Sequence, residues 1–190
     1  MNPFSNNSKT ISSISFSCTN IRSLGLSTKG LTRRKLNSIL NLETDVNILL
    51  DTKTSLTDTQ GIFNSFELKY KLANHRHIGT YTNVKGIIVI YNKNKTTIRN
   101  TTIIKEGQIL SFEIKINAEW INVVAIYAPP ERDDPNFFLE AKAALDSMEG
   151  DNGILLGDYN TTIDPDKDRQ AYIGDSHKKC RNVLQTWEST

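Results

Sequence analysis

The stretch ILLGDYN, residues 154–160, decides the fold class of this sequence. A mostly apolar run leads to Asp158 and, two residues later, to Asn160, and a turn-forming segment at 151–153 precedes it. This is the pattern of a buried strand that delivers a carboxylate at its C-terminal end. A second run of this kind, VNILL at 46–50, ends in Asp51. Two such strands favour an α/β architecture with polar groups at the strand ends.

Outward from this stretch, the hydrophobic pattern predicts more strands and three helices. Alternating apolar residues from Ile14 to Cys18 predict a strand that ends near Asn20. The other predicted strands cover residues 46–50, 66–72, 86–91, 109–116, 120–127 and 154–158. The predicted helices begin after an N-cap at Thr32, after the pair Asp134 and Pro135, and at residue 181. We therefore predict a four-layered α/β sandwich of two mainly antiparallel sheets with flanking helices.

Composition restricts the class of protein further. The chain has 190 residues, a formal net charge of +2 and 37% hydrophobic residues, which fits one domain with a sizeable core. The longest apolar run, residues 123–128, is far shorter than the roughly 20 residues of a membrane span, so we expect no membrane protein. Two cysteines and no apolar leader indicate an intracellular protein without a disulfide framework. We expect residues 1–10 to be a disordered lead-in and 11–190 to form the domain.

Polar residues at strand ends are the candidates for a functional site. Asn20, Asp51, Asp158 and Asn160 each follow an apolar or alternating strand, and ligands of α/β proteins collect at such ends. Carboxylate and amide oxygens suit Mg²⁺ or Mn²⁺. The alternative for each residue is ordinary turn chemistry, because Asn and Asp commonly end strands and start turns.

Taken together, the motifs resemble those of the endonuclease/exonuclease/phosphatase superfamily, and most closely the endonuclease domains of LINE-type (non-LTR) retrotransposons. The motifs are Asn20 in CTNIRSL, DTK at 51–53, IYAP at 126–129 and GDYN at 157–160, in that order. Supporting features are the basic segment RRK at 33–35, the strand GIIVI at 86–90 and the pair Asp168-Arg169.

The resemblance implies a role for each motif residue. Asp51 would be the metal-binding carboxylate, with Asn20 close to the same Mg²⁺ or Mn²⁺ site. Tyr127 would donate its phenol proton to a phosphoryl oxygen as negative charge develops there. Asp158 would position or deprotonate the attacking water, and Asn160 would orient the phosphate through its amide. The alternative for Tyr127 is a strand-end aromatic whose hydroxyl lies in water.

Basic residues near these motifs are candidates for contacts with nucleic-acid phosphates. They are Lys53, Arg33 and Arg34, and the alternative for the basic helix start is a solvated surface. The resemblance implies DNA as substrate, a covalently linked reverse transcriptase domain as partner, and a nuclear place of action. A net charge of +2 alone indicates no nucleic-acid footprint.

Two departures from the family pattern bear on catalysis. Asp51 stands where the family has Glu, which shortens the reach to a metal by roughly 1.5 Å. The family also carries Ser-x-x-Asp and Ser-Asp-His on two later strands, and these 190 residues do not contain them, so we expect the last strands of the fold to be missing. Asp175-Ser176-His177 has a similar composition in a different order, and we expect His75 and His77 to be surface residues. Without the catalytic His motif we expect little or no hydrolysis.

The motifs are compatible with three functions. The leading interpretation is a Mg²⁺-dependent DNA-nicking endonuclease of a retrotransposon. Within the same fold, a phosphatase or another nuclease uses the same metal and phosphate chemistry. A degenerate, non-catalytic remnant that only binds nucleic acid is the alternative from another class.

Overall fold

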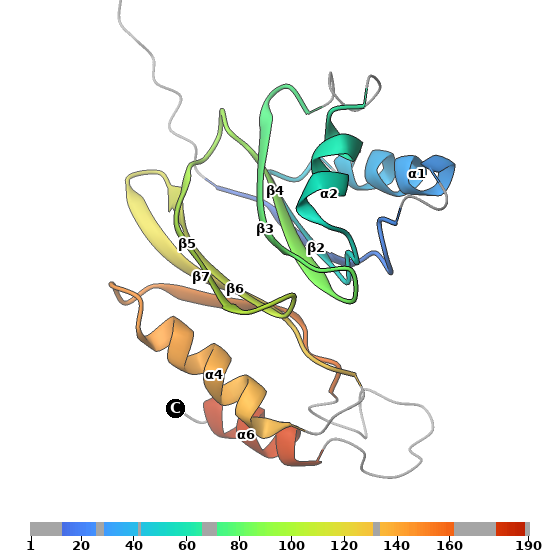
Figure 1. The fold of residues 1–190 in the computed structure, drawn as a ribbon. Coiled ribbons are helices and arrows are strands. Elements are labelled where there is room, and N and C mark those ends of the chain that lie inside the picture. The colour runs from blue at the N-terminus through green and yellow to red at the C-terminus, as the bar shows by residue number, and fades with distance from the viewer. Residues whose placement is uncertain are drawn as a thin grey trace, which may run out of the picture.

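The structure is a computed structural model that describes residues 13–25, 29–41, 43–65, 72–130, 134–161 and 178–188. Two four-stranded sheets pack face to face, with helices over both outer faces (Figure 1). Sheet 1 has the order β1-β2-β4-β3, and sheet 2 has the order β5-β6-β7-β8. The prediction of a four-layered α/β sandwich is confirmed.

Each sheet is built from a continuous part of the chain. Sheet 1 consists of β1 (Phe16–Asn20), β2 (Val46–Leu50), β3 (His75–Tyr81) and β4 (Gly86–Asn92). Sheet 2 consists of β5 (Ile98–Lys105), β6 (Ile109–Ile116), β7 (Glu119–Tyr127) and β8 (Gly153–Asp158). The helices are α1 (Lys29–Leu40), α2 (Leu56–Phe63), α4 (Pro135–Asp146) and α6 (Lys178–Glu188). In Figure 1, α1 and α2 cover sheet 1, and α4 and α6 cover sheet 2.

Three apolar clusters separate the four layers. The cluster between the sheets contains alternate residues of the central strands, such as Ile48, Val89 and Phe112. The opposite face of sheet 1 packs on α1 and α2 through residues such as Leu36, and that of sheet 2 packs on α4 and α6 through residues such as Phe138. Because both faces of the central strands are covered, VNILL and GIIVI are apolar almost throughout.

Parallel strand pairs set the position of the strand-end residues. β1 pairs with β2 in parallel, β7 pairs with β8 in parallel, and the remaining neighbours are antiparallel. Parallel neighbours end at the same edge of a sheet, so the residues that follow β1 and β2 lie together, as do those that follow β7 and β8. β1 and β8 also contact each other across the sandwich. All four ends therefore meet on one side of the molecule.

Several sequence predictions are wrong in detail. Thr32 is not an N-cap, because α1 begins at Lys29; its hydroxyl instead donates to the carbonyl oxygens of Leu24 and Gly25. The pattern analysis also missed α2, β3 and β5. Asp134 caps α4 as predicted, accepting a hydrogen bond from the backbone amide of Asn136.

Some predictions fall on residues 1–12, 66–71 and 162–177, which lie outside the described part of the chain. These include the disordered lead-in, most of the predicted strand at 66–72, the pair Asp168-Arg169, and His177. Within the described ranges, no helix has the length and apolar character needed to cross a bilayer.

Candidate metal and phosphate site

Sheet 1 supplies Asn20 and Asp51. Asn20 is the last residue of β1 and lies beside Leu50, the last residue of β2. The ladder continues into the loops, where the amide of Ser23 donates to the carbonyl of Asp51 at 2.7 Å. Asp51 has a φ of 56°, in the left-handed region, so the chain turns abruptly at the residue that carries the carboxylate.

The Asp51 side chain is buried and only partly satisfied. Its residue is 5% exposed, and the ammonium of Lys53 lies 3.1 Å from Oδ2. Oδ1 is buried and has no hydrogen-bond partner in the described structure. A buried carboxylate oxygen without a donor is costly, and a cation placed against it removes that cost.

Sheet 2 supplies Tyr127, Asp158 and Asn160. Tyr127 ends β7 beside Asp158, which ends β8, and its ring is buried in the cluster between the sheets. Asn160 has a φ of 45°, and its amide nitrogen donates to the carbonyl of Ala128 at 2.8 Å. Its backbone amide donates to Oδ1 of Asp158 at 3.1 Å. The two residues of the GDYN motif therefore hold each other in place.

A hydrogen bond across the sandwich joins the two halves. Nδ2 of Asn20 donates to Oδ2 of Asp158 at 3.0 Å, although the residues are 138 positions apart in the sequence. They open onto a pocket of about 590 Å³. Its lining comprises Cys18, Asn20, Leu50, Gly157, Asp158, Tyr159, Asn160 and Thr161. The structure thus brings together the predicted strand-end residues Asn20, Asp158 and Asn160, with Asp51 directly after the pocket residue Leu50.

Glycine at position 157 allows β8 to lie this close to β7. Gly157 has a φ of 151°, and a Cβ atom there would overlap the carbonyl of Ile126. No other residue type fits without displacing one of the strands. The glycine therefore sets the place where Asp158 leaves the sheet.

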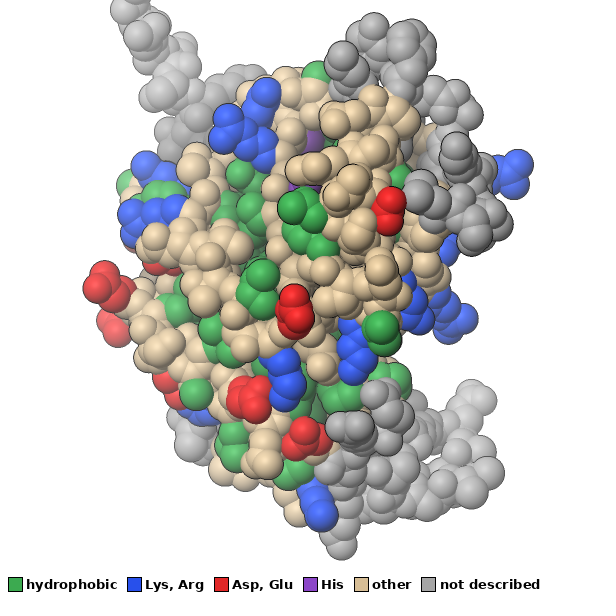
Figure 2. Space-filling view, in the orientation of Figure 1, with side chains coloured by type: hydrophobic (Ala, Val, Ile, Leu, Met, Phe, Trp, Pro, Cys, Tyr) green, Lys and Arg blue, Asp and Glu red, His purple; other side chains and the backbone are tan. Residues whose placement is uncertain are grey.

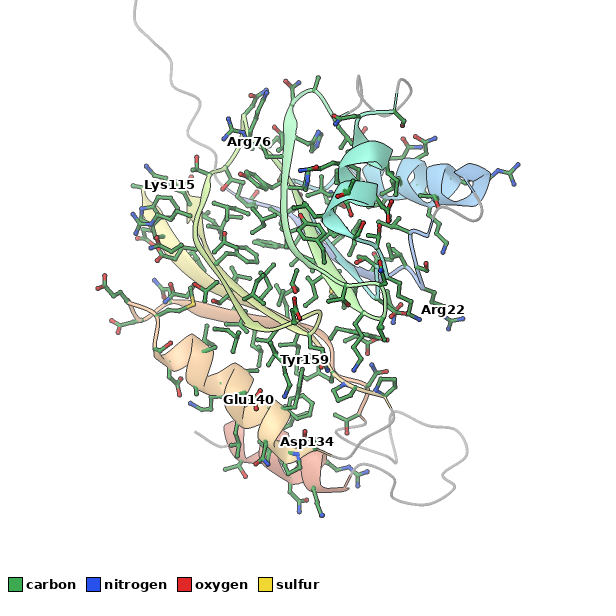
Figure 3. All side chains as sticks on the ribbon, viewed as in Figure 1. Arg22, Arg76, Lys115, Asp134, Glu140 and Tyr159 are labelled. Carbon is green, nitrogen blue, oxygen red and sulfur yellow. The ribbon has the colours of Figure 1, made fainter. Side chains whose placement is uncertain are left out.

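Sequence reasoning missed two pocket residues, Cys18 and Tyr159. Burial, with a further contribution from the charge of Asp158, raises the pKa of the Cys18 thiol to about 11, so the thiol is protonated at neutral pH. The Tyr159 ring stacks on Phe138 of α4, its hydroxyl donates to the carbonyl of Leu155, and burial raises its pKa. Figure 3 shows Tyr159 between the strands of sheet 2 and α4. The alternation that predicted β1 places Cys18 on the same face of the strand as Asn20. This spacing could have identified Cys18 as a pocket residue.

Of the basic candidates, Lys53 lies three residues after the end of β2, whereas Arg33 and Arg34 belong to α1. Lys53 and Arg34 are exposed, whereas the side chain of Arg33 is outside the described part of the structure. Figure 2 shows Lys and Arg side chains gathered at the side of the molecule where Figure 3 labels Arg22. Lys35 is half-buried, and its ammonium faces backbone carbonyls.

The two described histidines lie at the opposite end of sheet 1. His75 and His77 belong to β3 and pair with Asn92 and Ile90 of β4, far along the strand from Gly86. Both are partly buried rather than surface residues, and the ring of His77 meets that of Phe63 edge to face. Burial lowers the pKa of His77. Neither ring contributes to the strand-end pocket.

This architecture is shared with solved structures but not with any matched sequence. No protein-family model matches the sequence, and no curated protein sequence matches it. Solved structures do match. The endonuclease domain of TRAS1, a telomere-specific non-LTR retrotransposon, superposes with a TM-score of 0.62 at 11% identity, over 93% of this chain and 71% of that one. The chain has the endonuclease/exonuclease/phosphatase fold.

Two further structures with this fold show how widely it is shared. D. rerio TDP2 in complex with a single-strand DNA product superposes at 14% identity with a TM-score of 0.64, over 90% of this chain. An AP endonuclease from Archaeoglobus fulgidus superposes at 12% identity with a TM-score of 0.63, over 92% of this chain and 71% of that chain. The present chain covers 64% of the TDP2 structure. At these identities the likeness establishes the fold.

Proposed function

We propose that this chain is a Mg²⁺-dependent phosphodiester hydrolase that acts on DNA, an endonuclease of the kind found in non-LTR retrotransposons. One observation carries the proposal: the hydrogen bond from Asn20 to Asp158, which joins the ends of two sheets at a polar pocket beside the buried Asp51. Carboxylates and amides at such a junction are the groups that bind a hard cation and a phosphate.

The residues fit a divalent cation. Within the described ranges, no three His, Cys, Asp or Glu side chains gather in a metal-binding arrangement. Mg²⁺ nevertheless requires only one or two protein carboxylates, since it keeps several waters. The buried, unpartnered Oδ1 of Asp51 marks where a cation would be stabilised, with Asn20 on the adjacent strand. Mn²⁺ prefers the same ligands.

The chain's own residues would divide the work on the phosphodiester. A bound Mg²⁺ supplies charge stabilisation for the phosphate and the departing oxygen. Asp158, held by Asn20 and by the amide of Asn160, would accept a hydrogen bond from the attacking water. Asn160 keeps its Oδ1 and one N–H for orienting the phosphate, and Tyr127 would donate its phenol proton to a phosphoryl oxygen.

The DNA substrate and the retrotransposon origin belong to the same proposal. The shared fold with the TRAS1 endonuclease domain supports the origin, and the DNA complex of TDP2 supports the substrate class. Exposed Lys53 and Arg34 would contact phosphates along the DNA backbone. A linked reverse transcriptase domain and nuclear action follow from the retrotransposon origin.

A second function, nucleic-acid binding without hydrolysis, is favoured by one specific observation. The described histidines, His75 and His77, lie at the far end of sheet 1 from Asp158. An aspartate that acts without its histidine partner loses orders of magnitude in rate. A chain with this second function would bind the cation and DNA but would leave supercoiled plasmid unrelaxed.

The test combines cation binding with plasmid nicking. We expect saturable Mn²⁺ binding, followed by electron paramagnetic resonance, in the parent chain and its loss in Asp51→Asn, whereas Asp158→Asn should lose hydrolysis. Asp146→Asn is the matched control, because Asp146 is an exposed carboxylate on α4 that pairs with Lys142.

Supercoiled plasmid then separates the two functions. A hydrolase relaxes the plasmid in Mg²⁺ and stops with a chelator or with Asp158→Asn, whereas a binder only retards it. Mn²⁺ binding that is equal in the parent chain and in Asp51→Asn would contradict the site assignment.

A further inference from the structure

Lys35 holds the loop that follows β1. Its ammonium donates to three consecutive backbone carbonyls, those of Ile21 at 2.6 Å, Arg22 at 3.3 Å and Ser23 at 3.0 Å. Three carbonyls converge on one point because Arg22 and Ser23 both have positive φ values, 49° and 85°. Non-glycine residues rarely adopt this conformation, so a partner must stabilise it.

The amide groups of the same loop have partners on its other side. The amides of Ser23 and Leu24 donate to the carbonyls of Asp51 and Thr52, both at 2.7 Å. The amide of Arg22 donates to Oδ1 of Asn20 at 3.2 Å. The loop is thus held between the Lys35 ammonium, on α1, and the segment that carries Asp51.

This arrangement decides how the Asn20 side chain faces the pocket. The backbone amide of Arg22 can only donate, so the carboxamide oxygen of Asn20, rather than its nitrogen, must face Arg22. The nitrogen must then face the other way, toward Oδ2 of Asp158. The orientation of Asn20 therefore depends on the backbone of Arg22, which depends on Lys35.

We propose that Lys35 is a positioning residue for the strand-end site, acting through Arg22 and Asn20 on Asp158. That the site positioned by Lys35 binds a cation and a phosphate rests on the proposed function. The sequence suggested that this basic helix start is solvated or contacts phosphates, whereas the Lys35 ammonium is directed at the protein's own backbone.

Lysine suits this position better than arginine. An ammonium has three N–H donors that diverge from one atom, which matches three carbonyls around a point. A guanidinium has planar donors suited to forked acceptors such as carboxylates. Retaining the positive charge as Arg should therefore not restore the loop.

The first experiment measures the loop directly by amide hydrogen exchange in the full chain. We compare Lys35→Met, which keeps length and loses the donors, with Lys35→Arg and with Arg34→Met, which removes an exposed charge one residue away. We expect exchange at Ser23 and Leu24 to accelerate at least about 10-fold in both Lys35 variants relative to amides of β6, and not in Arg34→Met.

The second measurement is Mn²⁺ affinity in the same variants. We expect a loss of about 10-fold in Lys35→Met and in Lys35→Arg, as for other residues that orient ligands indirectly. In Lys35→Ala, propylammonium supplies the missing part of the side chain and should restore both affinity and protection at Ser23, whereas 1-propanol should not.

The outcomes distinguish this proposal from the proposed function. Unchanged exchange at Ser23 and Leu24 in Lys35→Met overturns the role of Lys35, even if Mn²⁺ binds normally. Equal acceleration in β6 also overturns it, because Lys35 would then stabilise only the fold. If the parent chain binds no Mn²⁺ while the loop opens as expected, the proposed function fails and the orientation of Asn20 by Lys35 stands.

Discussion

Sheet 1 and sheet 2 each supply half of the strand-end site, but they hold their residues by different means. In sheet 1, the loops after β1 and β2 are joined by backbone hydrogen bonds, and Asp51 is 5% exposed. In sheet 2, β8 is only partly buried along Gly153–Asp158, and Asn160 is tied by its side chain to Ala128. The Asp51 loop of the sheet 1 half is held by burial and backbone hydrogen bonds, whereas the sheet 2 half also depends on the side chain of Asn160.

The strongest test of this contrast concerns Gly157. Gly157→Ala should cost about 3 kcal/mol or more in free energy of unfolding, because its Cβ overlaps the Ile126 carbonyl at a positive φ. Gly61→Ala is the matched control in α2, where an added Cβ meets no atom and should stabilise by about 0.5–1 kcal/mol. Urea denaturation measures both, and equal effects would show that β8 can move away from β7.

Asn160 tests whether local contacts hold the sheet 2 half. Asn160→Ala should lower the free energy of unfolding by about 1–2 kcal/mol. It removes the hydrogen bond to Ala128 and leaves a non-glycine residue in the left-handed region, at a φ of 45°. Asn160→Gly removes the same bond but relieves the backbone, so it should cost less. If Gly were the more destabilising substitution in thermal unfolding, the backbone argument would be wrong.

Asp51 tests the sheet 1 half in the opposite direction. In the presence of a chelator, Asp51→Asn should raise the free energy of unfolding by up to about 1 kcal/mol, because it removes a buried anionic oxygen that has no partner. The ion pair that is lost is with the exposed Lys53 and contributes little. Mn²⁺ should then stabilise the parent chain and Asp51→Glu, but not Asp51→Asn. Calorimetry with and without Mn²⁺ checks this, and a large destabilisation in Asp51→Asn would indicate a structural residue.

The smallest effect concerns the pH dependence of sheet 1. Burial lowers the pKa of His77 below its ordinary value of 6.5, so the unfolded chain takes up a proton before the folded one does. The stabilisation is complete above pH 6.5 and is lost as the pH falls through the lower folded pKa. Relative to His77→Gln, the parent chain should lose roughly 2 °C more in melting temperature between pH 7.5 and 5.5. An equal fall in melting temperature in the parent chain and in His77→Gln would contradict this prediction.

Hydrophobic pattern predicted the elements that are buried on one or both faces. The strands at 46–50, 86–91, 109–116 and 120–127 match β2, β4, β6 and β7 closely, because burial forces apolar residues into them. β5 escaped prediction because it is an exposed edge strand with little alternation, although TTII at 101–104 is rich in β-branched residues. α2 carried a readable signal, since Ser55 caps it by accepting from the amide of Asp58.

For the site, the sequence could indicate which residues end strands but not how they bond. Asn20, Asp158 and Asn160 meet at one pocket as the motifs suggested. Both the orientation of Asn20 and the contact of the Lys35 ammonium with backbone carbonyls require the positive φ values of Arg22 and Ser23. Such backbone conformations leave little trace in sequence when the residues are not glycine.

The division of the sheets between consecutive parts of the chain has a consequence for engineering. β1 to β4 with α1 and α2 fall within 16–92, and β5 to β8 with α4 and α6 fall within 98–188, so each part carries the helices that cover its own sheet. Residues 93–97 join them, and Lys93 and Asn94 are exposed. A break between these two residues would yield a pair of fragments, each presenting half of the inner apolar surface to the other. Their reassembly would create the contact between Asn20 and Asp158 anew, so the pair would work as a two-part switch that responds only when both fragments are present.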